Sequence, residues 1–489
     1  MQLSAEKLDN LDPAIARPVY DRSAVTAGIL HVGLGNFHRA HQEVYIDDLL
    51  SVGGDLSWGI LGAGVMAADA GMREGLLEQD CLYTLVEQDG SGDSARIIGA
   101  MTGFLPVEEG HGPMIEAMGD PGIRIVSLTV TEGGYFIDAA TGTFDLNHPM
   151  VQADLAAPES PTTVFGAIVA GLRTRRASGE KPFTVMSCDN VPHNGNVCRA
   201  AVLGIANAQD PGLGAWIADN VTFPNGMVDR ITPATTPARV QYLADKFGVE
   251  DNRPVFCEPF IQWVLEDNFT NGRPALEKVG VQFVEDVTPY EHMKIRMLNG
   301  GHALIAYAGS LLGHTYAHEA MEDPLVSGFM EKVERDEVIT VFDAVPDMSH
   351  GNYLKLIMER FANPRVEDTI QRLCFDGSNR QPKFIVASIV DRLAAGLPAS
   401  GLALASALWC HYCEGGGGEH ARIEPNDPDW EHLRTVAAAS TERPAAWLEM
   451  SEIYGDLATN EAFATEFASW LTALRSKGAA ETLRDYLSA

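Results

Sequence analysis

A short apolar run that ends at glycines and is followed by a helical pattern constrains the fold of this chain more than any other feature. Residues 28–33 (GILHVG) are β-branched and apolar, which is typical of a buried parallel strand. Gly33 and Gly35 follow directly, where a tight turn brings backbone N–H groups toward a phosphate at a helix start. His38 replaces the third glycine of the usual G-x-G-x-x-G pattern. The loop therefore fits a nucleotide site and an ordinary strand–helix turn equally well.

The same alternation of strand and helix patterns continues along the first part of the chain. Further buried strands are expected at 58–65, 81–88, 123–130 and 182–188, with a helix at 164–173. After residue 286 helical patterns dominate, at 288–313, 324–342, 353–361, 384–393, 402–412 and 461–487. These patterns predict a doubly wound, Rossmann-type α/β domain over 1–285 and a mainly helical domain over 286–489. We expect the active site in the cleft between the two domains.

Composition excludes several classes of protein. A chain of 489 residues is too long for one ordinary core, and 46% hydrophobic with 21% charged residues is typical of a soluble globular protein. The net charge of −32 disfavours a nucleic-acid partner, because such affinity depends on Lys and Arg. We expect no membrane segment, since the longest apolar run is about half of the ~20 residues that a span needs, and no signal peptide precedes the first strand.

Cysteine usage indicates a reducing compartment. The seven cysteines are scattered and odd in number, so we expect free thiols and a cytoplasmic protein. Cys410 and Cys413 have a C-x-x-C spacing, but no second Cys/His pair follows at the distance that a zinc site needs. We therefore predict no metal.

A nucleotide site needs further cofactor-binding residues besides the glycine loop. Asn36 and Phe37 begin the helix after the loop and are assigned to the cofactor with Gly33 and Gly35. Asp69 is the first acid after the second strand and can favour NAD over NADP, although a loop or helix-cap role is equally compatible. Glu132, in TEGGY, follows another strand where open sheets bind ligands, and a glycine turn is the alternative.

The helix expected at 288–313 carries a polar sector. Thr288 is a candidate N-cap, with Pro289 at the first position and Glu291 closing a capping box. With Lys294 at zero on a wheel of about 100° per residue, Glu291 falls near ~60°, His302 near ~80° and Asn299 near ~140°. Arg296 points elsewhere, near ~200°, and is a candidate for an ion pair.

This polar sector can perform acid–base chemistry. Burial lowers the pKa of a lysine and makes Lys294 a candidate general base, while Asn299 can donate to a developing alkoxide and His302 can position the lysine or substrate. The alternative is a partly exposed face with a Glu291–Lys294 pair. Two glycines at 300–301 cost helix stability and indicate that another group approaches closely.

Five motifs in order resemble the polyol-specific long-chain dehydrogenases of the mannitol 2-dehydrogenase family. They are HVGLGNFHRAHQ, SLTVTEGGY, SCDNVPHNG, MVDRITP and KIRMLNGGHA. The resemblance covers almost the whole chain. The four-glycine run Gly415–Gly418, within the loop 413–430, departs from the loops of the group.

The resemblance implies a zinc-independent, NAD-linked oxidation of a polyol to a ketose, most specifically D-mannitol to D-fructose. It implies Lys294 as general base, Asn190 and Asn299 as an oxyanion site, and His302 as a contact to lysine and substrate. It further implies Glu291 as a proton relay. Asp229 and, on a less distinctive motif, Arg372 are the implied polyol ligands. We expect a monomer or weak dimer.

Other activities remain open at this point. Within the family, the chain can be a fructuronate or tagaturonate reductase, which would need an added Arg or Lys for the substrate carboxylate, or an arabinitol or sorbitol dehydrogenase. A catalytically silent nucleotide-binding protein is disfavoured by the retained lysine and asparagines. A zinc-dependent alcohol dehydrogenase is disfavoured because paired Cys/His ligands are absent from the sequence.

Overall fold

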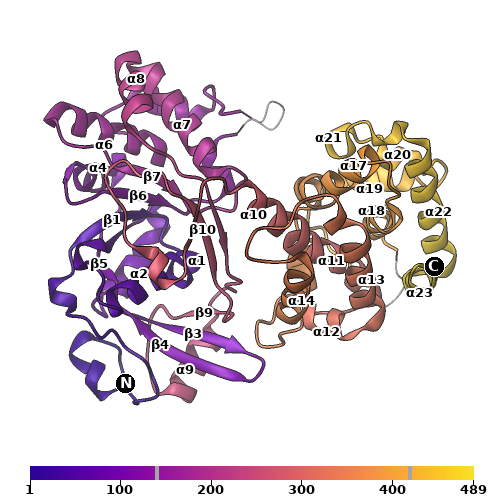
Figure 1. The fold of residues 1–489 in the computed structure, drawn as a ribbon, viewed down its shortest axis with the longest axis horizontal. Coiled ribbons are helices and arrows are strands. Elements are labelled where there is room, and N and C mark those ends of the chain that lie inside the picture. Colours follow the sequence, from indigo (N-terminus) through magenta and orange to yellow (C-terminus); the bar gives the residue numbers. More distant parts are fainter. Residues whose placement is uncertain (138–142, 417–420) are drawn as a thin grey trace. The chain divides into compact units, whose positions relative to one another are not determined.

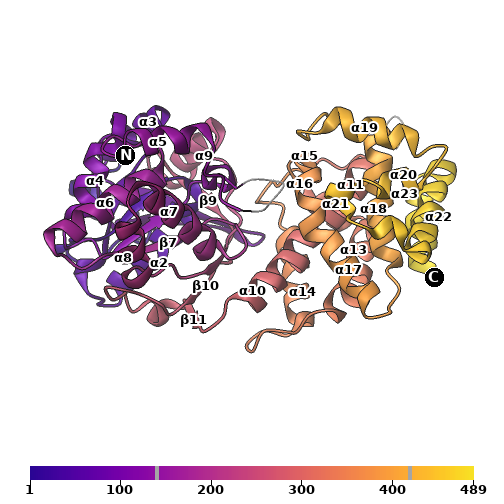
Figure 2. The ribbon, with the colours of Figure 1, turned by 90° about the horizontal axis from the view of Figure 1, so that it is seen from above.

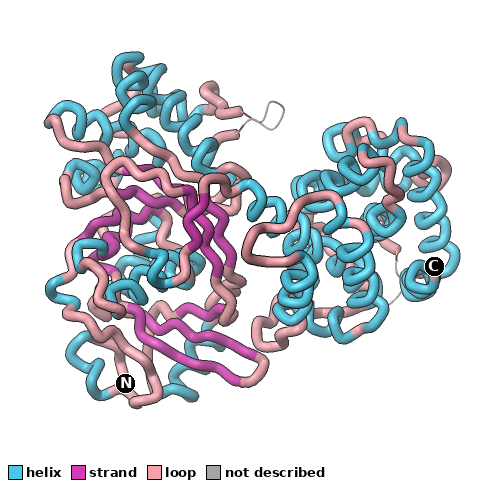
Figure 3. The backbone as a smooth tube through the Cα atoms, in the orientation of Figure 1, coloured by secondary structure: helices cyan, strands magenta, loops and turns pink. Residues whose placement is uncertain are grey.

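A computed structural model describes residues 1–137, 143–416 and 421–489. The chain separates into two units, Met1–Val287 and Thr288–Ala489. Among the described residues every strand belongs to the first unit, and the second is built from helices (Figure 3). The predicted α/β part followed by a mainly helical part is therefore confirmed as a fold class.

The centre of the first unit is a five-stranded parallel sheet. Its strands lie in the order β5-β2-β1-β6-β7. Their bounds are β5 Met101–Phe104, β2 Gly59–Ala63, β1 Ala27–Val32, β6 Ile125–Leu128 and β7 Thr184–Ser187. The chain passes from β1 to β2 on one side and later returns to β6 on the other side. This reversal between β1 and β6 is the position where open α/β sheets bind ligands, beyond the carboxyl ends of the strands.

Both faces of this sheet are covered, which explains why its strands read as continuous apolar runs. On one face Leu30 and Val126 pack in a core with residues of α4, α6, α7 and α8. These helices are α4 Gly112–Gly119, α6 Val164–Ser178, α7 Asn194–Gln209 and α8 Pro211–Asn220, and they lie side by side in Figures 1 and 2. On the other face Ile29 and Ile125 pack with α2 (Gln42–Ser51) and with a second sheet.

Two three-stranded sheets complete the first unit. One has the order β11-β10-β8 and the other β4-β3-β9. Their strands are β8 Gly226–Asp229, β10 Gln262–Glu266, β11 Gln282–Val284, β3 Tyr83–Asp89, β4 Gly92–Ile98 and β9 Val255–Cys257. The strand predicted at 81–88 is thus confirmed as β3, but it pairs with β4 and β9 instead of joining the main sheet. The remaining helices of this unit are α1 Asn36–Ala40, α3 Ala70–Leu77, α5 Pro149–Ala156 and α9 Pro237–Phe247.

Helices of the second unit match the predicted runs, with breaks that the patterns did not predict. The helix expected at 288–313 is α10 (Thr288–Met293), a π-helical turn η8 (Lys294–Asn299) and α11 (Gly300–Leu312). The run expected at 384–393 likewise contains a π-helical turn, η10 (Pro382–Val386), before α17 (Ala387–Ala394). The other helices are α12 Ala317–Glu322, α13 Pro324–Asp336, α14 His350–Phe361, α15 Ile370–Cys374, α16 Gly377–Gln381, α18 Ser400–Cys413, α19 Trp430–Ala439, α20 Ala445–Leu448, α21 Ser451–Tyr454, α22 Glu461–Lys477 and α23 Ala479–Ser488.

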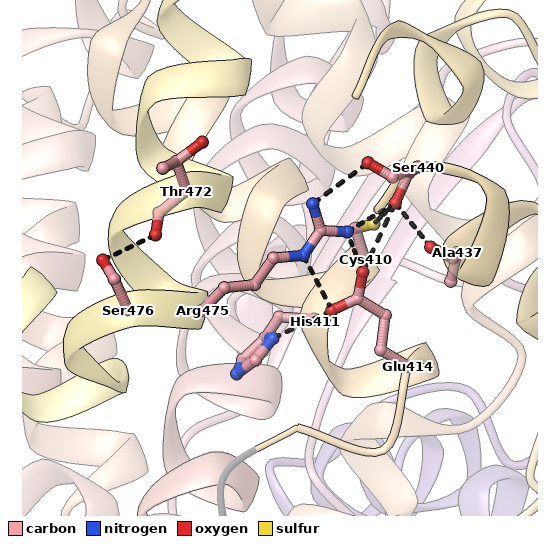
Figure 4. Close-up of polar contacts among 8 residues, drawn as sticks. All are labelled: Cys410, His411, Glu414, Ala437, Ser440, Thr472, Arg475 and Ser476. Atoms are coloured by element: carbon pink, nitrogen blue, oxygen red, sulfur yellow. Dashed lines mark hydrogen bonds and ion pairs between the residues drawn. The ribbon is translucent and has the colours of Figure 1, made fainter. Parts of the chain in front are cut away.

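The end of α18 is fixed by a charged cluster (Figure 4). Arg475 of α22 forms an ion pair with Glu414 and donates to the Ser440 carbonyl at 3.0 Å. His411 contacts Glu414 at 3.1 Å, so it pairs with a carboxylate rather than with the neighbouring cysteines. Burial alone would raise the pKa of Glu414, but hydrogen bonds from His411 and Arg475 outweigh it and lower that pKa. Gly417 and Gly418 of the four-glycine run lie outside the described residues.

No helix in the described ranges is long and apolar enough to cross a membrane. All seven cysteines are buried and unpaired. Burial raises the pKa of Cys81 to about 11 and that of Cys257 to about 12, so these thiols are poor nucleophiles at neutral pH.

Replacing Arg475 with methionine is expected to lower the free energy of unfolding by about 1–3 kcal/mol at pH 7, because Glu414 keeps its charge and loses its main partner. The deficit relative to wild type should shrink as the pH falls through the lowered pKa of Glu414, where the pair is lost in the wild type too. Calorimetry at pH 7 and pH 4 measures both effects. Lys477→Met, on the same helix as Arg475, is the matched control, since it breaks an exposed pair with Asp485 of α23. An equal loss of unfolding free energy in Arg475→Met and Lys477→Met would contradict a stabilising role for the Arg475–Glu414 pair.

Candidate active site

The glycine loop lies at the carboxyl end of β1, beside the end of β6. Gly33 has φ of 90°, and a Cβ there would lie 2.2 Å from the carbonyl oxygen of Thr129. Only glycine satisfies both conditions. The Gly33 carbonyl accepts from the Gly35 N–H at 2.8 Å and from the Thr129 hydroxyl at 2.6 Å. The loop is therefore a closed turn held against the neighbouring strand.

A buried hydrogen-bond chain supports this turn from below. His31 of β1 is fully buried, with Nε2 2.9 Å from Thr129 Oγ1 and Nδ1 2.8 Å from Ser127 Oγ. The Thr129 hydroxyl donates its one hydrogen to the Gly33 carbonyl, so its oxygen must accept a hydrogen bond from His31. Nε2 of His31 therefore carries the ring hydrogen. Nδ1 is then an acceptor and Ser127 donates to it. The chain thus fixes the tautomer of His31 and the orientation of both hydroxyls.

Gln42 continues this chain on the side of α2. Its Oε1 lies 3.1 Å from Ser127 Oγ. The single hydroxyl hydrogen of Ser127 is already given to His31, so a half-turn of the amide, which brings its NH2 group to Ser127, satisfies the contact. The chain then runs in one direction from Gln42 through His31 to Gly33.

His38, which stands where a third glycine is usual, packs under the loop. Its ring stacks on His31 with centroids 3.3 Å apart, and its Nε2 lies 3.7 Å from Glu43 Oε2. Burial lowers the pKa of His31 to about 3 and that of His38 well below its usual value, while burial raises the pKa of Glu43 to about 8. All three groups are neutral at pH 7, which avoids isolated charges under the loop.

Asp189 ties together the loops that follow β6 and β7. Its carboxylate accepts from the backbone N–H groups of Val130 and Thr131, at 3.0 and 2.9 Å, and from the Tyr135 hydroxyl at 2.7 Å. Thr131 has φ of 66°, an uncommon conformation for threonine that these bonds stabilise. Asn190, the predicted oxyanion donor, follows directly and its side chain is exposed. Asp189 therefore sets the position from which Asn190 projects.

The other predicted cofactor residues have structural partners as well. Asn36 accepts from Arg39 at 2.7 Å and donates to Thr235 at 3.2 Å, and the Phe37 ring stacks on His41. Asp69 accepts from the N–H groups of Val65 and Met66 at 2.7 and 2.9 Å, so the cap geometry considered for it is present. Glu132 begins a short 3-10 turn, and its side chain lies outside the described part of the structure. The roles of these residues toward a cofactor stay predictions.

Asp229 ends β8 with its side chain buried, next to Arg230. Arg230 contacts Glu87 at 2.5 Å and donates to the carbonyls of Ala40 and Glu258. It thereby fixes the end of α1, the helix that follows the glycine loop.

The predicted acid–base residues belong to the second unit, on α10, η8 and α11. Lys294 and Glu291 are buried, and Asn299 and His302 are half-buried. Arg296 forms the expected ion pair, with Asp391 of α17. The wheel assumed a regular α-helix, but Lys294–Asn299 form a π-helical turn, so the angles predicted for Asn299 and His302 are wrong. In such a turn each N–H bonds five residues back, as Gly300 does to Ile295, and residues beyond it are rotated.

The two glycines after Asn299 have the packing role that the sequence indicated. A Cβ on Gly301 would lie 2.8 Å from the Met330 methyl group and 3.2 Å from the Phe361 ring. A Cβ on Gly300 would lie 3.3 Å from the Phe384 carbonyl oxygen. Another helix and a second π-helical turn therefore approach this backbone closely.

Asp368 connects two residues that the sequence analysis singled out separately. Its carboxylate binds the Arg372 guanidinium with two contacts of 2.5 Å and lies 3.9 Å from His302 Nε2. The His302 ring also stacks on Phe361, with centroids 3.9 Å apart. Burial would raise the pKa of Asp368, but the hydrogen bonds and charge of Arg372 outweigh burial and lower it. Asp368 is therefore an anion that orients both a ring and a guanidinium.

The sequence analysis did not identify three residues that hold predicted site residues in place, namely Asp368, Asp189 and His31. Asp368 stands four residues before Arg372, a spacing that predicts a helical ion pair. Asp189 is the first residue of the D-N motif that was used only for Asn190. His31 gave no signal, because its partners Ser127 and Thr129 come from a distant strand. In the described residues no group of three or more His, Cys, Asp or Glu side chains is arranged to hold a metal ion.

His31→Gln is expected to reduce the pH dependence of stability. Below pH 6.5 the unfolded chain binds a proton at His31 that the folded chain, with a pKa of about 3, does not bind. Wild-type stability therefore loses about 1.4 kcal/mol per pH unit from this residue between pH 6.5 and 4.5, and the variant should lack that slope. Urea unfolding at several pH values measures it. Ser127→Ala removes a hydrogen bond to the same ring without a titrating group, so it should keep the slope. A variant with the wild-type slope would refute the buried neutral state.

Both parts of the chain match described protein families. Residues 27–278 match the Mannitol dehydrogenase Rossmann domain, and residues 286–475 match the Mannitol dehydrogenase C-terminal domain. Among curated relatives, the Mannitol 2-dehydrogenase of Cereibacter sphaeroides is 56% identical over 476 residues, covering 97% of this chain and 99% of the relative. The Mannitol 2-dehydrogenase of Aspergillus oryzae is 40% identical over 477 residues, covering 96% and 95%.

Two solved structures share the whole fold. One is the Pseudomonas fluorescens mannitol 2-dehydrogenase in a ternary complex with NAD and D-mannitol, with 42% identity, a TM-score of 0.89 and full coverage of both chains. The other is a D-sorbitol dehydrogenase in substrate-free form, with 36% identity, a TM-score of 0.90 and coverage of 98% and 100%. With both domain families matched in order and identity of 56% over nearly its whole length, the chain belongs to the mannitol dehydrogenase family.

Proposed function

We propose that this protein is an NAD-dependent polyol dehydrogenase that interconverts D-mannitol and D-fructose without a metal. The observation that carries the proposal is the buried Lys294, which lies on a π-helical turn with Glu291 and Asn299 close in sequence and His302 one turn further. The relative from Cereibacter sphaeroides, 56% identical to this chain, and the Pseudomonas fluorescens complex with NAD and D-mannitol support this substrate and cofactor.

The first unit fits a dinucleotide at the reversal between β1 and β6. Gly35 is exposed, and a Cβ there would meet only the Gly33 carbonyl, at 3.9 Å, so the backbone is open to a ligand. The N–H groups of the first turn of α1 have no carbonyl partner within the helix and can donate to phosphate oxygens. Asp69 places a negative charge near the end of β2, which favours NAD over NADP. Bound NAD supplies the hydride acceptor.

Lys294 acts as the general base. Lys294 is buried on the π-helical turn, and its amine takes the proton from the C2 hydroxyl. Glu291, three residues earlier and also buried, receives that proton and passes it to solvent. A positioned base of this kind contributes about 10²–10⁴-fold to the rate.

Amide and charged groups hold the substrate during this transfer. Asn190 and Asn299 donate N–H groups to the oxygen at C2 as negative charge develops there. Asp229 accepts from a substrate hydroxyl, and Arg372, held by Asp368, donates to another. His302 is oriented by its stack on Phe361, and its proposed role is to contact Lys294 and the substrate.

D-Sorbitol is the second candidate substrate. The D-sorbitol dehydrogenase structure matches this chain with a TM-score of 0.90, and the two polyols differ only in the configuration at C2. The higher identity to a mannitol 2-dehydrogenase favours mannitol.

The proposed compartment is a reducing cytoplasm, because the seven cysteines are buried and unpaired. The proposed oligomeric state is a monomer or weak dimer, because a single chain carries the complete set of proposed residues.

Substrate choice is tested by NADH absorbance with a panel of mannitol, sorbitol, arabinitol and fructuronate, each with NAD and with NADP. We expect the highest kcat/KM with NAD and mannitol for oxidation and with NADH and fructose for reduction. A chelator should leave these rates unchanged. Turnover with fructuronate alone would overturn the polyol assignment, and loss of activity with the chelator would overturn the metal-free mechanism.

Lys294→Ala is expected to lower kcat for mannitol oxidation by about 10²–10⁴-fold, because the general base is lost. Small primary amines added to the variant should restore part of the rate, with a pH dependence that follows the amine. Lys355→Ala is the control, since that lysine is exposed and pairs with Glu359 one turn along the same helix. Near-normal oxidation by Lys294→Ala would refute the mechanism.

A further inference from the structure

Glu334 of α13 is a fully buried carboxyl that the proposed chemistry does not use. Its side chain is 0% exposed, and neither oxygen has a hydrogen-bond partner when both are treated as acceptors. An ionised carboxylate in such a place would cost many kcal/mol. Burial accordingly raises the pKa of Glu334 well above its ordinary value. The group is therefore a neutral acid, which has an O–H to donate.

The surroundings of Glu334 offer acceptors for that hydrogen. Three oxygens converge on the point that a Cβ of Gly300 would occupy: the Phe384 carbonyl at 3.3 Å, Glu334 Oε1 at 3.6 Å and the Ile295 carbonyl at 3.8 Å. Glu334 therefore lies beside Gly300 together with two backbone carbonyls, the kind of group that accepts a carboxylic O–H. The absence of a side chain at Gly300 is what admits them.

These acceptors lie on the two π-helical turns of the second unit. Ile295 belongs to η8, which carries Lys294 and Asn299, and Phe384 belongs to η10. The two turns pack against each other. The Ile295 carbonyl accepts from the Gly300 N–H, and the Phe384 carbonyl lies nearer than the Ile295 carbonyl to the Cβ position of Gly300. A hydrogen bond from α13 to η10 beside Gly300 would connect α13 to a turn that packs against η8.

We propose that Glu334, as the neutral acid, donates to the Phe384 carbonyl and is a positioning residue for the π-helical turn that carries Lys294 and Asn299. The inference rests on the proposed function for its kinetic effect, but the protonation and the hydrogen bond do not depend on any substrate. π-Helical turns are frequent at functional sites and need outside support, because their backbone geometry is less favourable than that of an α-helix.

The test compares Glu334→Gln, which keeps a neutral donor, with Glu334→Leu, which removes it. Glu331→Gln on the exposed side of the same helix is the control. In the infrared difference spectrum of ligand-free protein at pH 7, wild type minus Glu334→Gln should contain a protonated carboxyl band, and wild type minus Glu331→Gln should not. The kcat for mannitol should stay within about fivefold in Glu334→Gln and fall by about 10²-fold in Glu334→Leu, with the KM for NAD unchanged in both.

Outcomes separate this inference from the proposed function. Absence of the band overturns the neutral acid, whether or not the enzyme oxidises mannitol. A folded Glu334→Leu with wild-type kcat overturns the positioning role, as does an equal loss of kcat in Glu334→Gln and Glu334→Leu. If Glu334→Leu does not fold, the kcat of Glu334→Met tests the positioning role and the infrared band tests the neutral acid. Failure of wild-type turnover, by contrast, overturns only the proposed function.

Discussion

The contact between Gly33 and the Thr129 carbonyl is the constraint on which the first unit depends. A Cβ would lie 2.2 Å from that oxygen, so the ends of β1 and β6 can meet this closely only at glycine. The Thr129 hydroxyl then reaches the Gly33 carbonyl and connects the turn to His31. Because the chain reverses direction across the sheet at this point, this contact also lies at the expected ligand position.

Buried polar groups in the two units are stabilised in two different ways. Where a partner of opposite charge or several N–H groups are present, the carboxylate stays ionised, as Asp368 does beside Arg372. Where burial outweighs such partners, as with Glu43 under the glycine loop, or acts alone, as with Glu334 beside Gly300, it raises the pKa of the carboxyl group and favours the neutral form. The ionised carboxylates orient hydrogen-bond donors near the surface, whereas the neutral carboxyl groups pack against buried backbone.

Local sequence patterns predicted the helices and strands better than they predicted which segments these elements contact. The strand, glycine turn and helix at 28–51 were predictable because each is determined by residues close in sequence, although His41 interrupts the helix. The sheet that receives β3 was not predictable, since its partners β4 and β9 are chosen by packing across the whole unit. Lys294 and Glu291 are predicted site residues because helix spacing and the family motif agree. His31 reaches its partners only through the fold, and the contact of Asp368 with His302 likewise depends on the fold, although its spacing to Arg372 was a local signal.

The π-helical turn changes what the catalytic helix can do. In an α-helix, residues four apart lie about 40° apart around the axis, whereas residues five apart lie about 140° apart. Bonding to the fifth residue gives position i+5 the place that i+4 has in an α-helix, so Asn299 moves from ~140° to about 40° from Lys294. In the proposed mechanism Lys294 and Asn299 act on the same substrate oxygen, and the π-helical turn brings them nearer to one face than a regular helix would. The wider turn therefore suits the proposed chemistry, and Gly300 at its end packs beside Phe384 and Glu334.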